Sequence, residues 1–242
     1  MTSSSELARV AALRARFAGS GGGVRVGIGD DAAVLEMPST AESVLVWTVD
    51  AQVEGTHFRT DWASWEDIGW RSFMAAASDL AAMGAEPMAA LSSLVLAPSV
   101  DDEALDALAR GQAAASAAAL APVVGGNLAR GAETSVTTTL LGRAVTPVLR
   151  GGARPGDGLW LAGPVGLAGI GLALLSKKMH DARIGEAASA CVRAWRRPVA
   201  RLAEGRVLAG VAHAAIDLSD GLAHDAWQLA EASGGRLVLD LA

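Results

Sequence analysis

Five aspartates in four short motifs carry the chemistry that this sequence suggests. Each motif lies where an apolar segment gives way to glycine or other small residues, and the motifs are spread over nearly the whole chain. The residues are Asp30, Asp50, Asp79, Asp217 and Asp220. Hard divalent cations need oxygen ligands, and Mg²⁺ typically binds one or two carboxylates together with substrate phosphates. Because the motifs have similar contexts, we predict that they meet in one magnesium–phosphate site.

The alternative interpretation of these aspartates is structural. A single Asp beside glycine is usually a turn residue or a helix cap. For Asp31 alone, which follows Asp30, both interpretations stay open. For the five aspartates together we favour the functional one, because clustered carboxylates repel one another and raise each other's pKa unless cations neutralise them. A fold that gathered them without a cation would lose stability.

Apolar runs separated by glycines predict the elements that must deliver these aspartates. The string VRVGIGDDAAVLEM predicts a strand, an acidic loop and a second strand, and SVLVWTVDAQVEG predicts a strand that delivers Asp50 at its end. Helices are expected over residues 64–84 and 101–119, and strands at LSSLVLAP and TSVTTTLLGRAV. The intervening VVGGN is interpreted as a turn.

A domain boundary is predicted near residues 144–156, where prolines and glycines cluster, giving domains 1–146 and 147–242. In the second domain, DGLWLAGPVG predicts a strand and a turn, and GLAGIGLALLSKK predicts a helix. HAAIDLSDGLAHDAWQLAEASG predicts a strand, an acidic turn and a helix, and RLVLDLA predicts a last strand. Because the chain stops on that strand, the second domain is expected to be incomplete.

Composition narrows the class of protein. Of the 242 residues, 51% are hydrophobic and 19% are charged, which fits one large or two modest folded domains. The net charge of -6 argues against a nucleic-acid partner, and no apolar run approaches the length of a membrane span. The single Cys191 fits a reducing compartment, so a cytoplasmic location is expected. Ser3 and Glu6 have capping-box spacing and predict a first helix, with an arginine-rich transit peptide as the alternative.

Other common sites find little support. The P-loop motif is absent, and no nucleophile elbow or serine triad is recognisable. The four histidines do not have zinc-like spacing with Cys191. The glycines between residues 163 and 171 loosely match a dinucleotide fingerprint, but we favour a simple helix start for them.

The acidic motifs and their order resemble the thiamine-monophosphate kinase family, of the aminoimidazole ribonucleotide synthetase-like superfamily. The matching strings are GIGDDAAVL, TVDAQVEGTHF, SDLAAMGAEP, GGARPGD and AIDLSDGLAHD, and the resemblance extends from about Glu6 to the last residue. It implies a two-domain α/β (α+β) fold that dimerises through the sheet of its first domain. It also implies transfer of a phosphoryl group from ATP to thiamine monophosphate with several Mg²⁺ ions.

The resemblance implies roles residue by residue. Metal ligation is implied for Asp30, Thr48, Asp50, Asp79, Asn127, Asp217 and Asp220. Nucleotide contacts are implied for Gly126, Asn127, Arg150 and Ser219, and a contact with the thiamine phosphate for His57. Taken alone, Arg150 in its glycine-rich turn is typical of a solvated surface charge, and His57 is typical of a structural histidine. No general base is assigned.

Three departures from the family pattern bear on activity. Asn127 replaces a metal-binding carboxylate, Ala76 replaces a usual Asn, and the chain ends before the family's GGEDYEL segment. They motivate two alternatives to the kinase. One is a catalytically impaired, nucleotide-binding or dimerising paralogue, and the other is a different ATP-dependent synthetase of the same superfamily.

Overall fold

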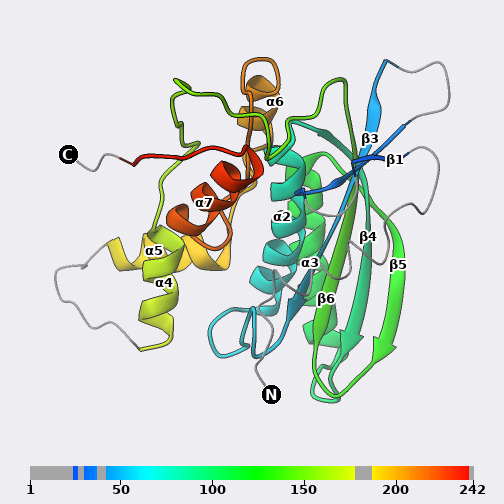
Figure 1. The fold of residues 1–242 in the computed structure, drawn as a ribbon. Helices are drawn as coiled ribbons and strands as arrows, with labels where there is room; N and C mark the ends of the chain where they lie inside the picture. Colours follow the sequence, from blue (N-terminus) through cyan, green and yellow to red (C-terminus); the bar gives the residue numbers. More distant parts are fainter. Residues whose placement is uncertain (1–23, 27–29, 37–41, 178–186, 240–242) are drawn as a thin grey trace, which may run out of the picture.

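A six-stranded mixed sheet with helices on one face organises the molecule (Figure 1). The computed structural model describes residues 24–26, 30–36, 42–177 and 187–239. The strand order is β1-β2-β3-β6-β4-β5; β4 and β5 are parallel, and the other neighbours are antiparallel. The bounds are β1 (Val24–Val26), β2 (Ala33–Leu35), β3 (Val44–Val53), β4 (Glu86–Leu96), β5 (Val123–Arg130) and β6 (Ser135–Ala144). The predicted mixed α/β fold is therefore confirmed, while the expected helix after Ser3 lies outside the described residues.

The alternation of β3 separates a covered face of the sheet from an open one. Val46 and Thr48 are buried toward the helices, whereas Trp47 and Val49 are 47% and 64% exposed on the other face. Successive side chains of a strand point to opposite faces, so the sequence of β3 builds half the core and an apolar outer surface together. The same alternation continues in β6, where Leu140 is buried and Leu141 is only partly covered.

Two long helices cover the inner face. Helix α2 (Trp65–Ala82) follows the N-cap Ser64, and α3 (Asp102–Ala119) follows the N-cap Asp101, each with a side-chain oxygen that accepts a backbone N–H. The helices touch through glycines: a Cβ on Gly69 would lie 2.0 Å from the Leu108 oxygen. This close contact fixes how α2 lies over the sheet.

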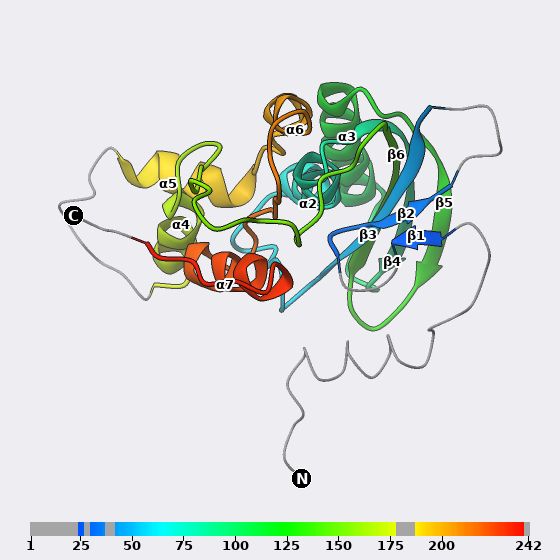
Figure 2. The ribbon, with the colours of Figure 1, turned by 45° about the horizontal axis from the view of Figure 1, so that its top comes forward.

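Four shorter helices lie on the side of α2 that faces away from the sheet, as both ribbon views show (Figures 1 and 2). They are α4 (Leu167–Leu175), α5 (Ala187–Arg196), α6 (Leu202–Leu208) and α7 (Leu222–Ala232). Residues after α5 are attached to α2, because Arg197 pairs with Glu66 and Asp67 and the Trp70 indole donates to the Pro198 oxygen at 2.7 Å. The division at residues 146 and 147 stays a prediction. None of the described helices is long and apolar enough to cross a bilayer.

Two sets of secondary-structure predictions were wrong. VVGGN lies in β5 and not in a turn, because Val123–Arg130 pairs in parallel with β4, and Gly126 runs so close to Ser92 that no side chain would fit. The strands predicted within residues 157–162, 213–217 and 236–239 do not form. No described strand pairs with these segments, and Trp160 among them is 86% exposed. β-propensity alone therefore did not produce a strand there.

Candidate metal and phosphate site

Three carboxylates from distant parts of the chain meet beside the sheet. Asp31, Asp79 and Asp217 each offer one oxygen, and these atoms lie within 4.8 Å of one another. They come from the loop before β2, from α2, and from the segment before α7. The structure thus brings together two of the predicted residues, Asp79 and Asp217, with a third aspartate that the prediction had left open.

Strand β3 supplies the floor of this cluster. Thr48, Asp50 and Gln52 alternate along the strand and therefore share its helix-facing side. The Thr48 hydroxyl donates to Oδ2 of Asp79, and the Gln52 amide donates to Oδ1 of Asp50 at 2.7 Å. Asp50 is near enough for its charge to raise the pKa of both Asp79 and Asp217. Thr48 thus contacts the cluster directly, and Asp50 lies near it on the same strand, although its oxygens are not among the three grouped ones.

Burial and mutual repulsion disfavour charge on these acids. Burial raises the pKa of Asp79 to about 8, with further contributions from Asp217, Asp31 and Asp50 that the Thr48 hydrogen bond opposes. Burial likewise raises the pKa of Asp31 to about 6, although Arg150 acts in the other direction. The pKa of Asp217 is raised, first by burial and then by the charge of Asp225. Raised pKa values of this kind are typical of functional sites in which several carboxylates lie close together without a bound cation.

Arg150 is the positive group nearest to this cluster in the described structure. Its Nε donates to Oδ1 of Asp31 at 2.9 Å, and its Nη1 donates to Oε1 of Gln228 on α7 at 3.1 Å. The Asp31 side chain is only 1% exposed, and its Oδ2 has no hydrogen-bond partner. Buried polar atoms are nearly always paired. A carboxylate oxygen left unpaired beside two further carboxylates fits a cation, so the residues present fit Mg²⁺.

Asp30 was predicted as a ligand, and its carboxylate occupies a different position. It accepts from the backbone N–H of Asp31 at 2.9 Å and from that of Arg150 at 3.3 Å, and it is not one of the three clustered acids. Of these two neighbouring acids, the structure places Asp31 and not Asp30 among the three grouped carboxylates. The resemblance had implied Asp30, and for Asp31 alone the structural and functional interpretations had stayed open. Ligation by Asp30 stays a prediction.

Asp220 and Ser219 lie on the loop that precedes α7, in a separate group. Asp220 joins His224 and Asp225, whose ligand atoms lie within 4.8 Å of one another. Asp225 is 1% exposed and accepts the backbone N–H groups of residues 219, 220 and 221 at 3.0–3.2 Å. Asp225 thus fixes this loop, a role that the sequence analysis did not predict. Its position in the first turn of a helix, after a glycine, was the available signal.

The other predicted contacts lie away from the three clustered acids. Gly126 and Asn127 are on β5, opposite Ser92 and Ser93 of β4, and both β6 and β4 lie between them and β3. His57 is exposed, and its Nδ1 accepts the Val53 N–H at 3.1 Å. The proposed roles of these residues therefore stay predictions.

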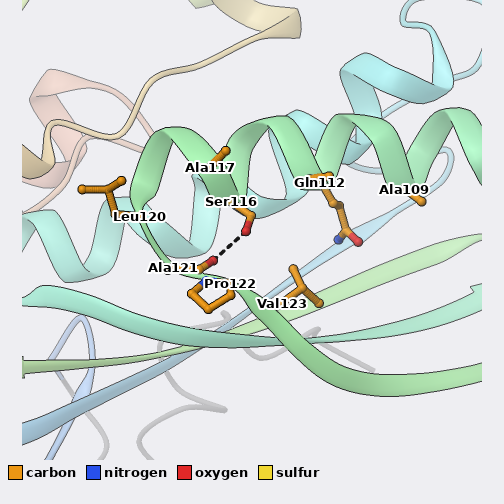
Figure 3. Close-up of a pocket in the computed structure, with 9 residues that line it drawn as sticks. Ala109, Gln112, Ser116, Ala117, Leu120, Ala121, Pro122 and Val123 are labelled. Carbon is orange, nitrogen blue, oxygen red and sulfur yellow. Dashed lines mark hydrogen bonds between the residues drawn. The ribbon is translucent and has the colours of Figure 1, made fainter.

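A cavity of ≈ 790 Å³ between α3 and the start of β5 differs from this site in chemistry (Figure 3). Small apolar residues form most of its wall, and Ser116 in it donates to the Ala121 oxygen at 2.7 Å. It contains no titratable side chain. It therefore lacks the charged side chains that the acidic cluster and Arg150 provide.

Known proteins are similar to this chain in sequence. The family description "AIR synthase related protein, N-terminal domain" matches residues 29–144. The thiamine-monophosphate kinase of Halobacterium salinarum is 36% identical over 219 residues, which are 90% of this chain and 70% of that protein. The thiamine-monophosphate kinase of Escherichia coli (strain K12) is 34% identical over 224 residues, 90% of this chain. The chain spans 66% of the length of that Escherichia coli protein.

A solved structure extends the comparison to three dimensions. The structure "AaThiL complexed with AMPPCP and TMP" superposes with a TM-score of 0.85 at 29% identity. The match covers 95% of this chain and 70% of that one. The likeness in fold therefore extends over nearly all of the chain.

Proposed function

Since the chain belongs to the thiamine-monophosphate kinase family, we propose that it phosphorylates thiamine monophosphate to thiamine diphosphate with ATP. The single observation that carries the proposal is the meeting of Asp31, Asp79 and Asp217 around an unpaired buried oxygen. The solved relative "AaThiL complexed with AMPPCP and TMP" supports the choice of substrates. ATP and thiamine monophosphate are accordingly the small-molecule partners that we propose.

Mg²⁺ is the cation that this donor set would hold. Asp31, Asp79 and Asp217 offer carboxylate oxygens, and Asp50 and Thr48 lie next to them on β3. Several carboxylates in one cluster suit more than one ion. When bound, Mg²⁺ supplies positive charge that reduces repulsion between the two anionic substrates and stabilises the phosphoryl group in transit.

The chain's own residues position the reactants. Arg150 has a planar fork of donors of the kind that binds phosphate, and here the fork donates to Asp31 and Gln228, so it would have to exchange a partner to bind a substrate phosphate. Asp225 fixes the loop before α7 by accepting its backbone N–H groups. A phosphate oxygen of thiamine monophosphate attacks the terminal phosphorus of ATP, a new P–O bond forms, and ADP leaves. The attacking oxygen is already anionic, so no side chain has to remove a proton.

A second copy of the chain is the macromolecular partner that we propose. The open face of the sheet carries large apolar side chains, among them Trp47, Val49 and Leu91, which are 47%, 64% and 42% exposed. Contiguous exposed apolar patches mark interaction sites. A homodimer formed through this face would bury them.

A nucleotide-binding protein without catalysis is the second candidate, and Asn127 favours it. Asn127 stands where the family pattern has a carboxylate, and a neutral amide holds Mg²⁺ less tightly than a carboxylate does. This candidate predicts Mg²⁺-dependent nucleotide binding without product.

The test is incubation of the purified protein with ATP, Mg²⁺ and thiamine monophosphate, followed by chromatography for thiamine diphosphate. We expect product that depends on Mg²⁺ and is lost in Asp79→Asn. Nucleotide binding without product would favour the second candidate. Neither binding nor product would refute both.

A further inference from the structure

A buried chain of hydrogen bonds runs from the cluster to the end of α5. The Gln52 amide nitrogen donates to Oδ1 of Asp50 at 2.7 Å, and its Oε1 accepts from Nε of Arg71 at 3.3 Å. A second guanidinium nitrogen of Arg71 donates to the main-chain oxygen of Trp195. Gln52 is 5% exposed, so this chain is largely shielded from water.

Arg71 is held by this geometry without a carboxylate partner in the described structure. Its guanidinium lies over the Trp195 ring, 4.6 Å from the centroid, and hydrogen bonds to an amide and a carbonyl. The charge of Asp50 stabilises it at longer range, while burial lowers its pKa. Arg71 is therefore a buried cation that is linked through Gln52 to Asp50, and this link suggests a function.

We propose that Gln52 and Arg71 are positioning residues that orient the Asp50 carboxylate toward the cation site and connect it to the end of α5. The proposal rests on the proposed function only in that this cluster binds a divalent cation. It concerns residues that touch no substrate and act through Asp50.

The donor rules of the three side chains make the orientation unambiguous. A guanidinium only donates and an ionised carboxylate only accepts. Arg71 therefore requires the oxygen of the Gln52 amide, which turns the amide nitrogen toward Asp50. Because that nitrogen occupies Oδ1 of Asp50, Oδ2 is the oxygen that we expect to face the cation. Partners of this kind typically change metal affinity by about 10–100-fold when they are removed.

Simple electrostatics and positioning predict opposite results for two substitutions. Gln52→Glu adds a negative charge beside the cluster, and Arg71→Met removes a positive one. Charge alone would make either variant bind Mg²⁺ more tightly. Positioning predicts weaker binding, because Glu cannot donate to Asp50 and Met cannot hold the amide of Gln52.

The experiment is Mg²⁺ titration by calorimetry in the absence of substrates, with thermal unfolding of each metal-free variant measured alongside. We expect Gln52→Glu and Arg71→Met each to weaken Mg²⁺ binding about tenfold. Arg71→Lys keeps the charge and loses the fork, and it should bind Mg²⁺ as weakly as Arg71→Met.

Gln112→Leu is the matched control. Gln112 is also 5% exposed, and it hydrogen bonds to Ser92, Ser72 and Thr138 but to no carboxylate. It should lower the unfolding temperature and leave Mg²⁺ affinity unchanged. The positioning role is overturned if Gln52→Glu or Arg71→Met binds Mg²⁺ at least as tightly as the wild type. If neither variant folds, Arg71→Lys decides by the same criterion.

The result is separable from the proposed function. If the wild type binds Mg²⁺ but makes no thiamine diphosphate, the proposed kinase activity is refuted and the positioning role of Gln52 and Arg71 is not affected. If the wild type makes product and the variants keep the Mg²⁺ affinity of the wild type, only the positioning role is refuted. Absence of Mg²⁺ binding by the wild type would remove both.

Discussion

At the level of single residues, protons and cations compete for the same carboxylate oxygens. The Asp79 carboxyl, with its pKa raised to about 8, is largely protonated near neutral pH in the metal-free protein. Asp31 and Asp217 are shifted in the same direction. A bound Mg²⁺ requires the charged form, so its binding should release protons. Occupancy of this site therefore depends on pH as well as on the Mg²⁺ concentration.

The metal-free protein should lose stability as pH rises from about 4 to about 8. In the folded chain burial raises the pKa of Asp79 above its ordinary value of 3.8, so the folded state holds more protons in this window than the unfolded state. Raising the pH removes these protons and lowers the free energy of unfolding. With EDTA present, the unfolding temperature should fall by roughly 10 °C, and Asp79→Asn should reduce this fall. Thermal unfolding followed by circular dichroism measures it; a stability that rises over the same window would contradict it.

Asn127→Asp should tighten Mg²⁺ binding in the presence of nucleotide. Even at the dielectric constant of bulk water, a carboxylate about 4 Å from a divalent cation contributes about 2 kcal/mol, or roughly thirtyfold in affinity. Asn127→Ala provides the comparison, because it removes the amide oxygen without adding charge. Titrations with Mg²⁺ and nucleotide that coincide for wild type and both variants would remove position 127 from the metal site.

At the level of elements, α2 is the part that most directly controls the site. It carries Asp79 and Arg71, while Gly69 brings its first half against α3. A Cβ at Gly111 of α3 would lie 1.9 Å from the Glu66 oxygen of α2, so both helices give up side chains at their crossing. Because α2 also contacts β3 through Thr48, a shift of this helix would move the cluster.

Gly69→Ala should destabilise the protein by about 2 kcal/mol, since forcing extra atoms into a packed contact costs about 1–3 kcal/mol. Gly169→Ala on α4 is the matched control, because its Cβ would meet nothing within 4 Å. The control should be neutral or slightly stabilising, as alanine favours the helix. Urea denaturation of both variants tests the difference in stability. Equal urea midpoints would show that α2 and α3 can move apart to accommodate the extra methyl group.

Local signals predicted the elements that carry their own capping and periodicity. Helices α2 and α3 begin where Ser64 and Asp101 were expected to start them, and β3 carries Asp50 within the strand, which continues to Val53, and not at its end as predicted. Long-range pairing was not predictable: β5 exists because β4 lies beside it, and the segment around Trp160 has no such neighbour. The sequence selected Asp30 together with Asp79 and Asp217, whereas the structure groups Asp31 with Asp79 and Asp217.

At the level of the whole molecule, helices cover one face of the sheet, and no element of the described ranges covers the other. Trp47 and Val49 of β3, Leu91 of β4 and Val124 of β5 are exposed on the sheet in the single chain. The proposed homodimer would use this face. The acidic cluster lies toward α2 and α7 instead, so dimerisation through the open face leaves the cluster accessible.

Val49→Lys should convert the proposed dimer into a monomer. A charge placed at the centre of an apolar interface must be desolvated without a partner, which is costly. Val211→Lys is the control, because Val211 is 73% exposed but lies after α6, away from the sheet. Light scattering coupled to size exclusion should find a monomer for Val49→Lys and a dimer for the wild type and Val211→Lys. A wild type that is itself monomeric would contradict the proposed interface.

The strand order also has a consequence for how the protein is made. Strands β3 and β4 do not touch each other, because β6 lies between them and pairs with both. During synthesis, both strands leave the ribosome before residues 135–144 do. Until β6 emerges, the edge of β3 and the edge of β4 that pair with it have no partner strand. Such edges are templates for association with other chains. A nascent chain paused before β6 is therefore the stage at which we expect chaperone binding and aggregation to concentrate.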